Sequence, residues 1–196
     1  VSQQNRIGLD SYLDMEGLTF HLKSHKTKGI DREKMFENLM TDIGPPEWST
    51  DFDHKSFYSS PSEENSNSLS WSKNYQPGYM FRNLGNEKVY FNKQTNRLLQ
   101  NYRSAYVQLA FTYYLDYMRE SGKKKAGSKE LTLDLKRRIV SILNKMSRNI
   151  PEATIPIQSG DLHHQIARIY GDLDEKELMR EIMETLINQE NSRPLK

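Results

Sequence analysis

The sequence of 196 residues lacks several features on which protein function is commonly built. It contains no cysteine, which excludes thiol catalysis, cysteine-ligated zinc and disulfides, and which suits either a reducing or an oxidising compartment. Its net charge of +2 is too small to imply a polyanionic partner. No apolar run approaches the length of a transmembrane helix. Because Val1 is not a natural start, we expect the chain to be one compact domain cut from a longer protein.

Catalytic motifs are also missing. There is no glycine-rich phosphate loop, no GxSxG elbow and no HExxH pair. Asp10, Asp14 and Glu16 are close enough in sequence for acid–base chemistry, but a solvated turn explains them better. His21 and His25 have the spacing of helical metal ligands, yet the local pattern is that of a strand. We therefore predict no catalytic residue, no cofactor and no metal in this chain.

The stretch around which the chain is organised runs from Asn92 to Ser121. Its apolar residues recur at alternating spacings of three and four, which places them on one helix face: Leu99, Tyr102, Tyr106, Leu109, Tyr113 and Tyr117. Neighbouring apolar residues widen this stripe: Leu98, Ala105, Ala110 and Tyr114. The sequence predicts a buried central helix over 92–121 that ends at Gly122. Arg103, within the stripe, is expected to have a structural role.

The N-terminal part alternates between apolar and polar residues over 17–25. This period of two predicts a half-buried strand, whose best partner is Tyr79–Arg82 and whose second choice is Val89–Phe91. An apolar stripe over 31–43 predicts a helix with Asp31 as its N-cap.

Residues 44–77 show neither the apolar period of a helix nor that of a strand. They are rich in Ser, Asn, Asp and Pro, which predicts a long polar surface loop. After the central helix, three further apolar stripes predict helices whose N-caps are Ser128, Ser159 and Asp174. The last half of the chain is thus expected to form two helical hairpins.

These hairpins share features with tetratricopeptide repeats. Ala167 and Tyr170 stand where such a repeat places its small residue and its Tyr, although Met179 and Leu186 replace expected small residues. We expect a mainly α fold of antiparallel helical hairpins, a degenerate tetratricopeptide-like array, with a small N-terminal strand-containing cap. The cap spans 1–43, the loop 44–77 and the array 78–196.

Helical-hairpin arrays usually leave a concave face formed by the first helix of each pair. A partner that binds there would contact Gln108, Thr112, Asp116, Gln165 and Arg168. The alternative is that residues 1–43 fold across this face and cover it, and it is favoured because these residues carry apolar stripes that need somewhere to pack.

A basic cluster follows the central helix. Its members are Lys123–Lys125, Lys129, Lys136, Arg137 and Arg138. Nucleic-acid binding is one interpretation. A solvated charged face is favoured, because acidic residues later in the chain can balance the cluster: Asp172, Asp174, Glu175, Glu177 and Glu181.

Three stretches together carry a family resemblance. They are RIGLDSYLDMEGLTFHL at 6–22, VYFNKQTNRLLQNYRSAYVQLA at 89–110 and IPEATIPIQSGDLHHQIARIYGD at 150–172. They resemble the C-terminal soluble region of a bacterial family, common in Bacteroidetes, of multi-pass membrane proteins of unknown function. The membrane part of that family looks like a GT-C, protein O-mannosyltransferase-like glycosyltransferase.

The resemblance implies that the catalytic acids lie in the membrane part, so no catalytic residue is carried onto this chain. It implies a non-catalytic, periplasmic accessory module whose partner is its own membrane domain or an acceptor protein. We expect no nucleic acid and no direct membrane insertion. Three alternatives remain: a tetratricopeptide-like peptide-binding adaptor, a nucleic-acid-binding domain and an unrecognised hydrolase.

Overall fold

The computed structural model describes residues 8–41, 78–79, 81, 83–122 and 127–191. This part of the chain forms five α-helices and a two-stranded antiparallel sheet, which confirms the expected mainly α fold with a small N-terminal sheet. The elements, in chain order, are β1 (Leu13–Met15), β2 (Phe20–Leu22), α1 (Arg32–Met40), α3 (Lys93–Ser121), α4 (Ser128–Asn149), α5 (Gly160–Asp172) and α6 (Lys176–Asn191). The expected loop at 44–77 lies outside the described residues.

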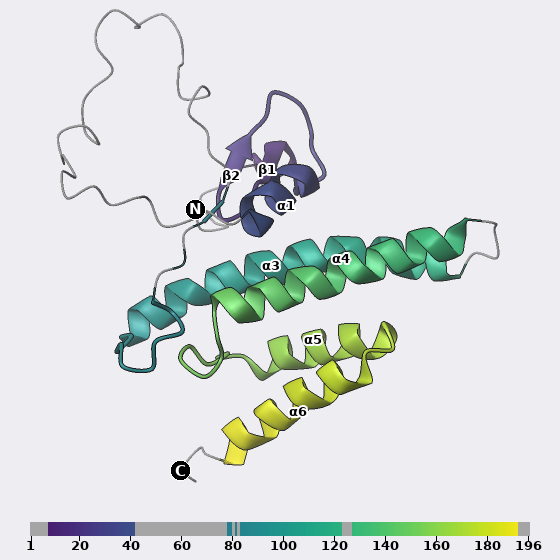
Figure 1. The fold of residues 1–196 in the computed structure, drawn as a ribbon. Helices are drawn as coiled ribbons and strands as arrows, with labels where there is room; N and C mark the ends of the chain where they lie inside the picture. Colours follow the sequence, from purple (N-terminus) through teal and green to yellow (C-terminus); the bar gives the residue numbers. More distant parts are fainter. Residues whose placement is uncertain (1–7, 42–77, 80, 82, 123–126, 192–196) are drawn as a thin grey trace, which may run out of the picture.

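The elements are stacked in three layers (Figure 1). The N-terminal unit of β1, β2 and α1 lies on one side of the α3–α4 hairpin, and the α5–α6 hairpin lies on the other. The core joins all three layers, since it includes Met35 of α1, Leu109 of α3, Ile139 of α4 and Ile166 of α5. Within the described residues, no helix combines the length and the apolar character that crossing a membrane requires.

Helix α3 is the centre of the fold, as the sequence predicts. Asn92 caps it by accepting a 2.8 Å hydrogen bond from the backbone N–H of Thr95, and Gly122 follows its last residue. Tyr106 and Leu109 are completely buried, whereas Tyr102 and Tyr117 at the ends of the stripe are half-buried. A helix of 29 residues is about 44 Å long, so it can contact every other layer.

Helix α1 lies against α3 through aromatic and apolar contacts. Asp31 caps α1, as predicted, by accepting from the backbone N–H of Lys34. The ring of Phe36 meets that of Tyr113 edge-on at 6.1 Å. The N-terminal unit is thus packed onto the central helix.

The strand prediction was wrong in its partner and its burial. β2 pairs with β1, with Met15 opposite Phe20, and the side chains of Phe20 and Leu22 are exposed. A hairpin closed by a four-residue turn loses less chain entropy than a pairing across some sixty residues, which explains the local choice. Tyr79 still reaches the hairpin, because its hydroxyl accepts from the backbone N–H of Leu18 at 3.0 Å.

Two of the predicted N-caps do not act as caps. Ser128 is the first residue of α4, after Gly127 in a left-handed conformation, and its hydroxyl donates to the carbonyl of Glu120 instead. Ser159 precedes α5 but makes no capping hydrogen bond through its side chain. The helix order and the two hairpins are nevertheless those expected.

Candidate functional site

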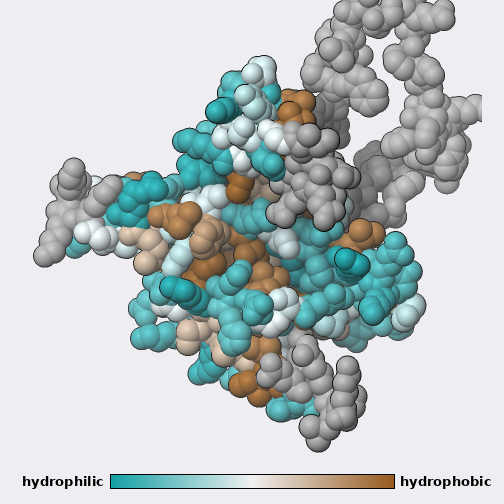
Figure 2. Space-filling model, turned by 180° about the vertical axis from the view of Figure 1, so that it is seen from behind, coloured by the Kyte–Doolittle hydropathy of each residue, from teal (hydrophilic) through white to brown (hydrophobic). Residues whose placement is uncertain are grey.

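A groove runs along α3 between the N-terminal unit and α5, and its volume is about 1450 Å³. We call it the α3 groove. Its floor is the stretch of α3 from Val107 to Arg119; Asp14 and residues 25–33 form one wall, and α5 forms the other. From behind the molecule, hydrophobic side chains gather between the N-terminal unit and the lower helices, with polar side chains around them (Figure 2).

Two large apolar side chains of the groove floor are exposed. Phe111 is 47% exposed and Leu115 is 48% exposed, one helical turn further along α3. They continue from the buried Val107 at a spacing of four, so they form a second stripe beside the buried one. The ring of Phe111 also lies 5.8 Å from that of Tyr114, which helps to hold it in place.

All five residues predicted for partner binding line this groove. Gln108, Thr112 and Asp116 come from α3, and Gln165 and Arg168 come from α5. The structure therefore brings the five together on one surface, while their binding role stays a prediction. Sequence reasoning missed Phe111 and Leu115, although their spacing of four was a signal that could have identified them.

The groove is held open by contacts at both walls. Asp116 accepts hydrogen bonds from Arg32 of the N-terminal unit and from Arg119, the latter at 3.1 Å. The Arg32 guanidinium also lies 4.9 Å from the centre of the Tyr113 ring. These contacts tie the N-terminal wall to the floor.

The opposite wall is attached to α3 by Asp172. The Tyr114 hydroxyl donates a 2.5 Å hydrogen bond to its carboxylate, and the Arg168 guanidinium lies 3.8 Å away. Burial raises the pKa of Tyr114, and the hydrogen bond to Asp172 raises it further. The phenol therefore stays protonated and remains a donor.

The N-terminal unit forms a wall of this groove and does not close it. Its α1 helix covers Tyr106 and Tyr113 of α3, but Phe111 and Leu115 stay about half exposed. Among the described residues, the N-terminal unit therefore covers part of the α3 face and leaves the part around Phe111 and Leu115 open.

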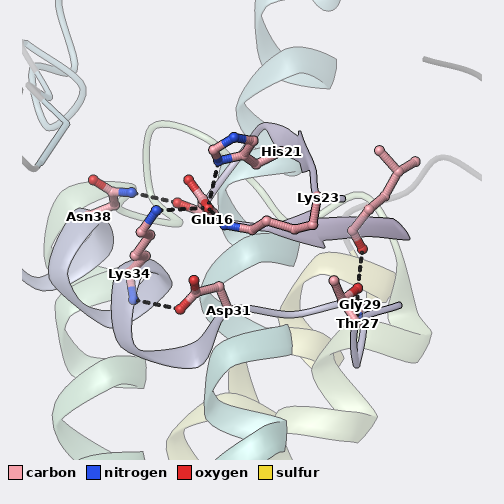
Figure 3. A network of polar contacts seen from close by, with 9 residues as sticks. Glu16, His21, Lys23, Thr27, Gly29, Asp31, Lys34 and Asn38 are labelled. Carbon is pink, nitrogen blue, oxygen red and sulfur yellow. Dashed lines mark hydrogen bonds and ion pairs between the residues drawn. The ribbon is translucent and has the colours of Figure 1, made fainter. Parts of the chain in front are cut away.

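Glu16 is the centre of a separate polar cluster (Figure 3). Its carboxylate accepts from Lys23 at 2.9 Å, from His21 at 3.0 Å and from Lys34 of α1 at 3.1 Å. Burial alone would raise the pKa of Glu16, but the hydrogen bonds from Lys23, Lys34 and His21 outweigh it and lower that pKa to about 2. The hydrogen bonds from Lys34 and from the Asn38 amide, both on α1, join the turn of the β1–β2 hairpin to that helix, so the cluster has a structural role.

The other carboxylate and histidine residues considered in the sequence are not gathered into one site. Asp14 and His25 lie in the N-terminal wall of the α3 groove. Of the adjacent pair, His163 is buried and His164 is exposed. Within the described ranges, no group of three His, Cys, Asp or Glu side chains is placed to hold a metal ion.

Arg103 and His163 fix the connection between α4 and α5. The buried Arg103 guanidinium donates to the carbonyls of Ile150 and Ile155, and the His163 imidazole is hydrogen-bonded to Glu152. Burial lowers the pKa of Arg103 to about 10, and the nearby Glu152 opposes that shift. Arg103 therefore has the structural role that the sequence favoured.

Comparison of the chain with protein-family models, with curated proteins and with solved structures finds no match. The α3 groove is therefore the main observation from which a function can be argued.

Proposed function

We propose that this chain is a non-catalytic interaction module whose α3 groove binds one amphipathic helix of a partner protein. The observation that carries this proposal is the pair of exposed apolar side chains, Phe111 and Leu115, on the floor of a walled groove. Exposed apolar side chains that lie together mark interaction sites in soluble proteins. In helix-in-groove recognition an amphipathic helix lays its apolar face into a hydrophobic groove, and Phe111 and Leu115 supply an apolar floor of that kind.

The length of the groove suits a short helix. The floor from Val107 to Arg119 covers about 18 Å of helix axis, which is the length of about three turns of an α-helix.

The charges around the groove favour an amphipathic partner over a strongly charged one. The side chains that line it carry four positive and four negative charges: Lys28, Arg32, Arg119 and Arg168, and Asp14, Asp31, Glu33 and Asp116. A balanced rim gives little long-range attraction but does select the orientation of a helix with mixed charges.

Selection from a library of displayed helical peptides, randomised on one face, tests the proposal. We expect enriched peptides with two apolar residues three or four apart. Their Kd should rise at least about tenfold for Phe111→Ala and Leu115→Ala, a change of about 1.4 kcal/mol in binding free energy. Leu131→Ala is the matched control, because Leu131 is 46% exposed on α4 and outside the groove. Enriched peptides that bind all three variants equally well would contradict the proposal.

The family resemblance extends the proposal to a parent protein. In this extension the chain is the periplasmic accessory module of a membrane glycosyltransferase-like protein, and its partner is its own membrane domain or an acceptor protein. The support is the resemblance over 6–22, 89–110 and 150–172 alone. The reading frame upstream of Val1 tests it: about ten hydrophobic spans of about 20 residues support the parent, and a cytosolic domain there contradicts it.

We also propose that the two hairpins are a degenerate tetratricopeptide-like pair. Ala167 and Tyr170, the two residues that match the repeat pattern, are both buried in α5. Their burial supports the proposal, whereas the unequal helix lengths, 29 and 22 residues against 13 and 16, oppose a regular repeat. In this case the module is a peptide-binding adaptor, which the peptide selection also tests.

A further inference from the structure

The apolar floor of the α3 groove continues into the last turns of α3. Met118 is 47% exposed, follows Phe111 and Leu115 at spacings of four and three residues, and lies just outside the enclosed part of the groove. With 3.6 residues per turn, the three side chains fall within about 60° of one another around the helix axis. They form a narrow row along α3 that covers about 10 Å of its axis. The floor therefore offers three apolar contacts in line.

The α5 wall ends beside this row. Asp172 is the last residue of α5, and it accepts from the hydroxyls of Tyr114, at 2.5 Å, and Tyr117, at 3.4 Å. Helix α3 continues to Ser121, and the α3–α4 hairpin extends past the end of α5 (Figure 1). Hydrophobic side chains reach from the centre of this face towards the tip of that hairpin (Figure 2). The groove is therefore open at its Met118 end.

The other end of the groove is closed by the connection between α4 and α5. The side chain of Gln100 is on the floor side of α3, seven residues before Val107, and donates to the carbonyl of Pro156 at 3.2 Å. Arg103 holds the same connection by donating to the carbonyl of Ile155. Because Gln100 is in line with the floor and Pro156 is exposed, this connection stands across the end of the groove, about 10 Å before Val107. A helix in the groove cannot continue past it.

We infer that the α3 groove takes the end of an amphipathic helix, which lies along α3 with its tip towards Pro156 and leaves the groove over Met118. This inference rests on the proposed function and adds the direction of the partner helix, its third contact and its free end. Because the row of apolar side chains is narrow, a helix packed on it stays within about 20° of the α3 axis, as in paired helices. Its own apolar residues then recur at i, i+3 or i+4, and i+7.

The shape of the groove argues against a second copy of this chain as the occupant. In a symmetric dimer through this face, the α3 helices of the two copies would have to meet. Each α3 lies between its own walls, the N-terminal unit and α5, so the walls of the two copies would collide before the floors touch. The occupant that fits is a helix with one free end, at a terminus or at the tip of a helical hairpin of a partner protein.

Fluorescence anisotropy with the full chain tests the third contact. The probe is a labelled, alanine-based helical peptide with three leucines on one face, spaced by four and three residues. In two comparison peptides, Gln replaces the first or the last leucine. Met118→Ala should raise the Kd of the three-leucine peptide about fivefold, because a side chain that is half exposed in the free chain no longer becomes buried on binding. For one of the two comparison peptides the Kd should change by less than about twofold, because that peptide lacks the leucine that meets Met118.

Leu98→Ala is the matched control for Met118→Ala. Leu98 is also exposed on α3, but it lies beyond the closed end of the groove. The Kd of the three-leucine peptide should therefore stay within about twofold of the wild-type value. Both substitutions are at exposed positions, so neither should impair folding.

Fusion of a folded protein to the three-leucine peptide tests the closed end. Ubiquitin joined directly to one end of the peptide should raise the Kd at least about tenfold, because the α4–α5 connection leaves no room beyond the tip of the helix. Ubiquitin joined to the other end should change it by less than about twofold, because that end leaves the groove over Met118.

The outcomes separate this inference from the proposed function. If the three-leucine peptide does not bind, or binds Phe111→Ala as well as the wild type, the proposed function fails and the inference fails with it. If binding depends on Phe111 but equally on Met118 and Leu98, or on neither, the inference alone is overturned. The same holds if both ubiquitin fusions bind alike. In sedimentation velocity, a dimer of the free chain that Met118→Ala dissociates would identify a second copy as the occupant and would also overturn the inference.

Discussion

The hydroxyl of Tyr106 donates a 2.8 Å hydrogen bond to the carbonyl oxygen of Leu39, 67 residues earlier in the chain. Leu39 lies in the last turn of α1, where carbonyl groups have no partner within the helix. The same hydroxyl accepts from the side-chain amide of Asn149 at 2.9 Å. One buried phenol on α3 thus joins the ends of α1 and α4.

Tyr106→Phe removes this junction without changing the shape of the core. We expect it to lower the free energy of unfolding by about 1–3 kcal/mol, because the carbonyl of Leu39 loses its buried donor. Urea denaturation measures the loss. Tyr117→Phe is the control, because its hydroxyl makes a longer, exposed bond of 3.4 Å, and it should cost less than about 0.5 kcal/mol. An equal loss in the free energy of unfolding for the two variants would show that the hydrogen bond to Leu39 does not stabilise the fold more than the exposed bond of Tyr117.

Leu109 and Leu115 are on the same helix but have opposite surroundings. Leu109 is fully buried, so Leu109→Ala should cost about 2–5 kcal/mol through lost burial and a cavity. Leu115 is 48% exposed, so Leu115→Ala should change stability by less than about 1 kcal/mol while it weakens binding in the α3 groove. Thermal or urea unfolding distinguishes the two. A loss below about 1 kcal/mol for Leu109→Ala would mean that its burial contributes little.

The helical part of this fold could be predicted because its signals are local. The stripe through Leu109 and the cap at Asn92 lie within the helix they define. The pairing of β2 could not be predicted in the same way, because the alternation around Phe20 shows a strand but not its neighbour. Burial of Phe20 was also inferred wrongly, since a two-stranded hairpin at the edge of the molecule has no layer to cover both faces.

The α3 groove was partly predictable for the same reason. Helical spacing placed Gln108, Thr112 and Asp116 on one side of α3, and a general property of helical hairpins brought Arg168 to that side. Arg32 could not be found from the sequence. Its contact with Asp116 spans 84 residues and depends on how α1 packs on α3, which no local pattern encodes.

Arg103 should tolerate even a conservative change poorly. Arg103→Lys keeps the charge but cannot reproduce the fork that donates to Gln100 and to the carbonyls of Ile150 and Ile155. We expect a loss of about 1–3 kcal/mol in the free energy of unfolding. Arg97→Lys, on the exposed side of the same helix, should cost less than about 0.5 kcal/mol. If the two variants are equally stable, the hydrogen bonds from Arg103 to the α4–α5 connection contribute little to stability.

The Glu16 cluster predicts acid sensitivity. The pKa of Glu16 is lowered from 4.5 to about 2 in the folded chain, so its stabilisation is complete above about pH 4.5 and is lost as the pH falls towards 2. A shift of this size corresponds to at most about 3 kcal/mol, and partial exposure of Lys34 and His21 reduces that value. Glu16→Gln should therefore be destabilised at neutral pH and should approach the wild type near pH 2.

Urea unfolding of wild type and Glu16→Gln over this pH range measures the difference. Glu33→Gln, an exposed change on α1, is the control and should follow the wild-type curve closely. A stability difference between wild type and Glu16→Gln that stays constant down to pH 2 would contradict the assigned role of the cluster.

The N-terminal unit supplies the last prediction. Its α1 helix covers part of α3 through Phe36, and its residues 25–33 form one wall of the α3 groove. Removing residues 1–43 uncovers Tyr106 and Tyr113, so we expect strong binding of a hydrophobic dye, a lower melting temperature and association of the product. Arg32→Ala is the milder comparison, because it removes the contact with Asp116 and leaves the apolar packing in place. A truncated chain that stays monomeric and as stable as the whole would show that the N-terminal unit is not part of the core and that the groove needs only α3 and α5.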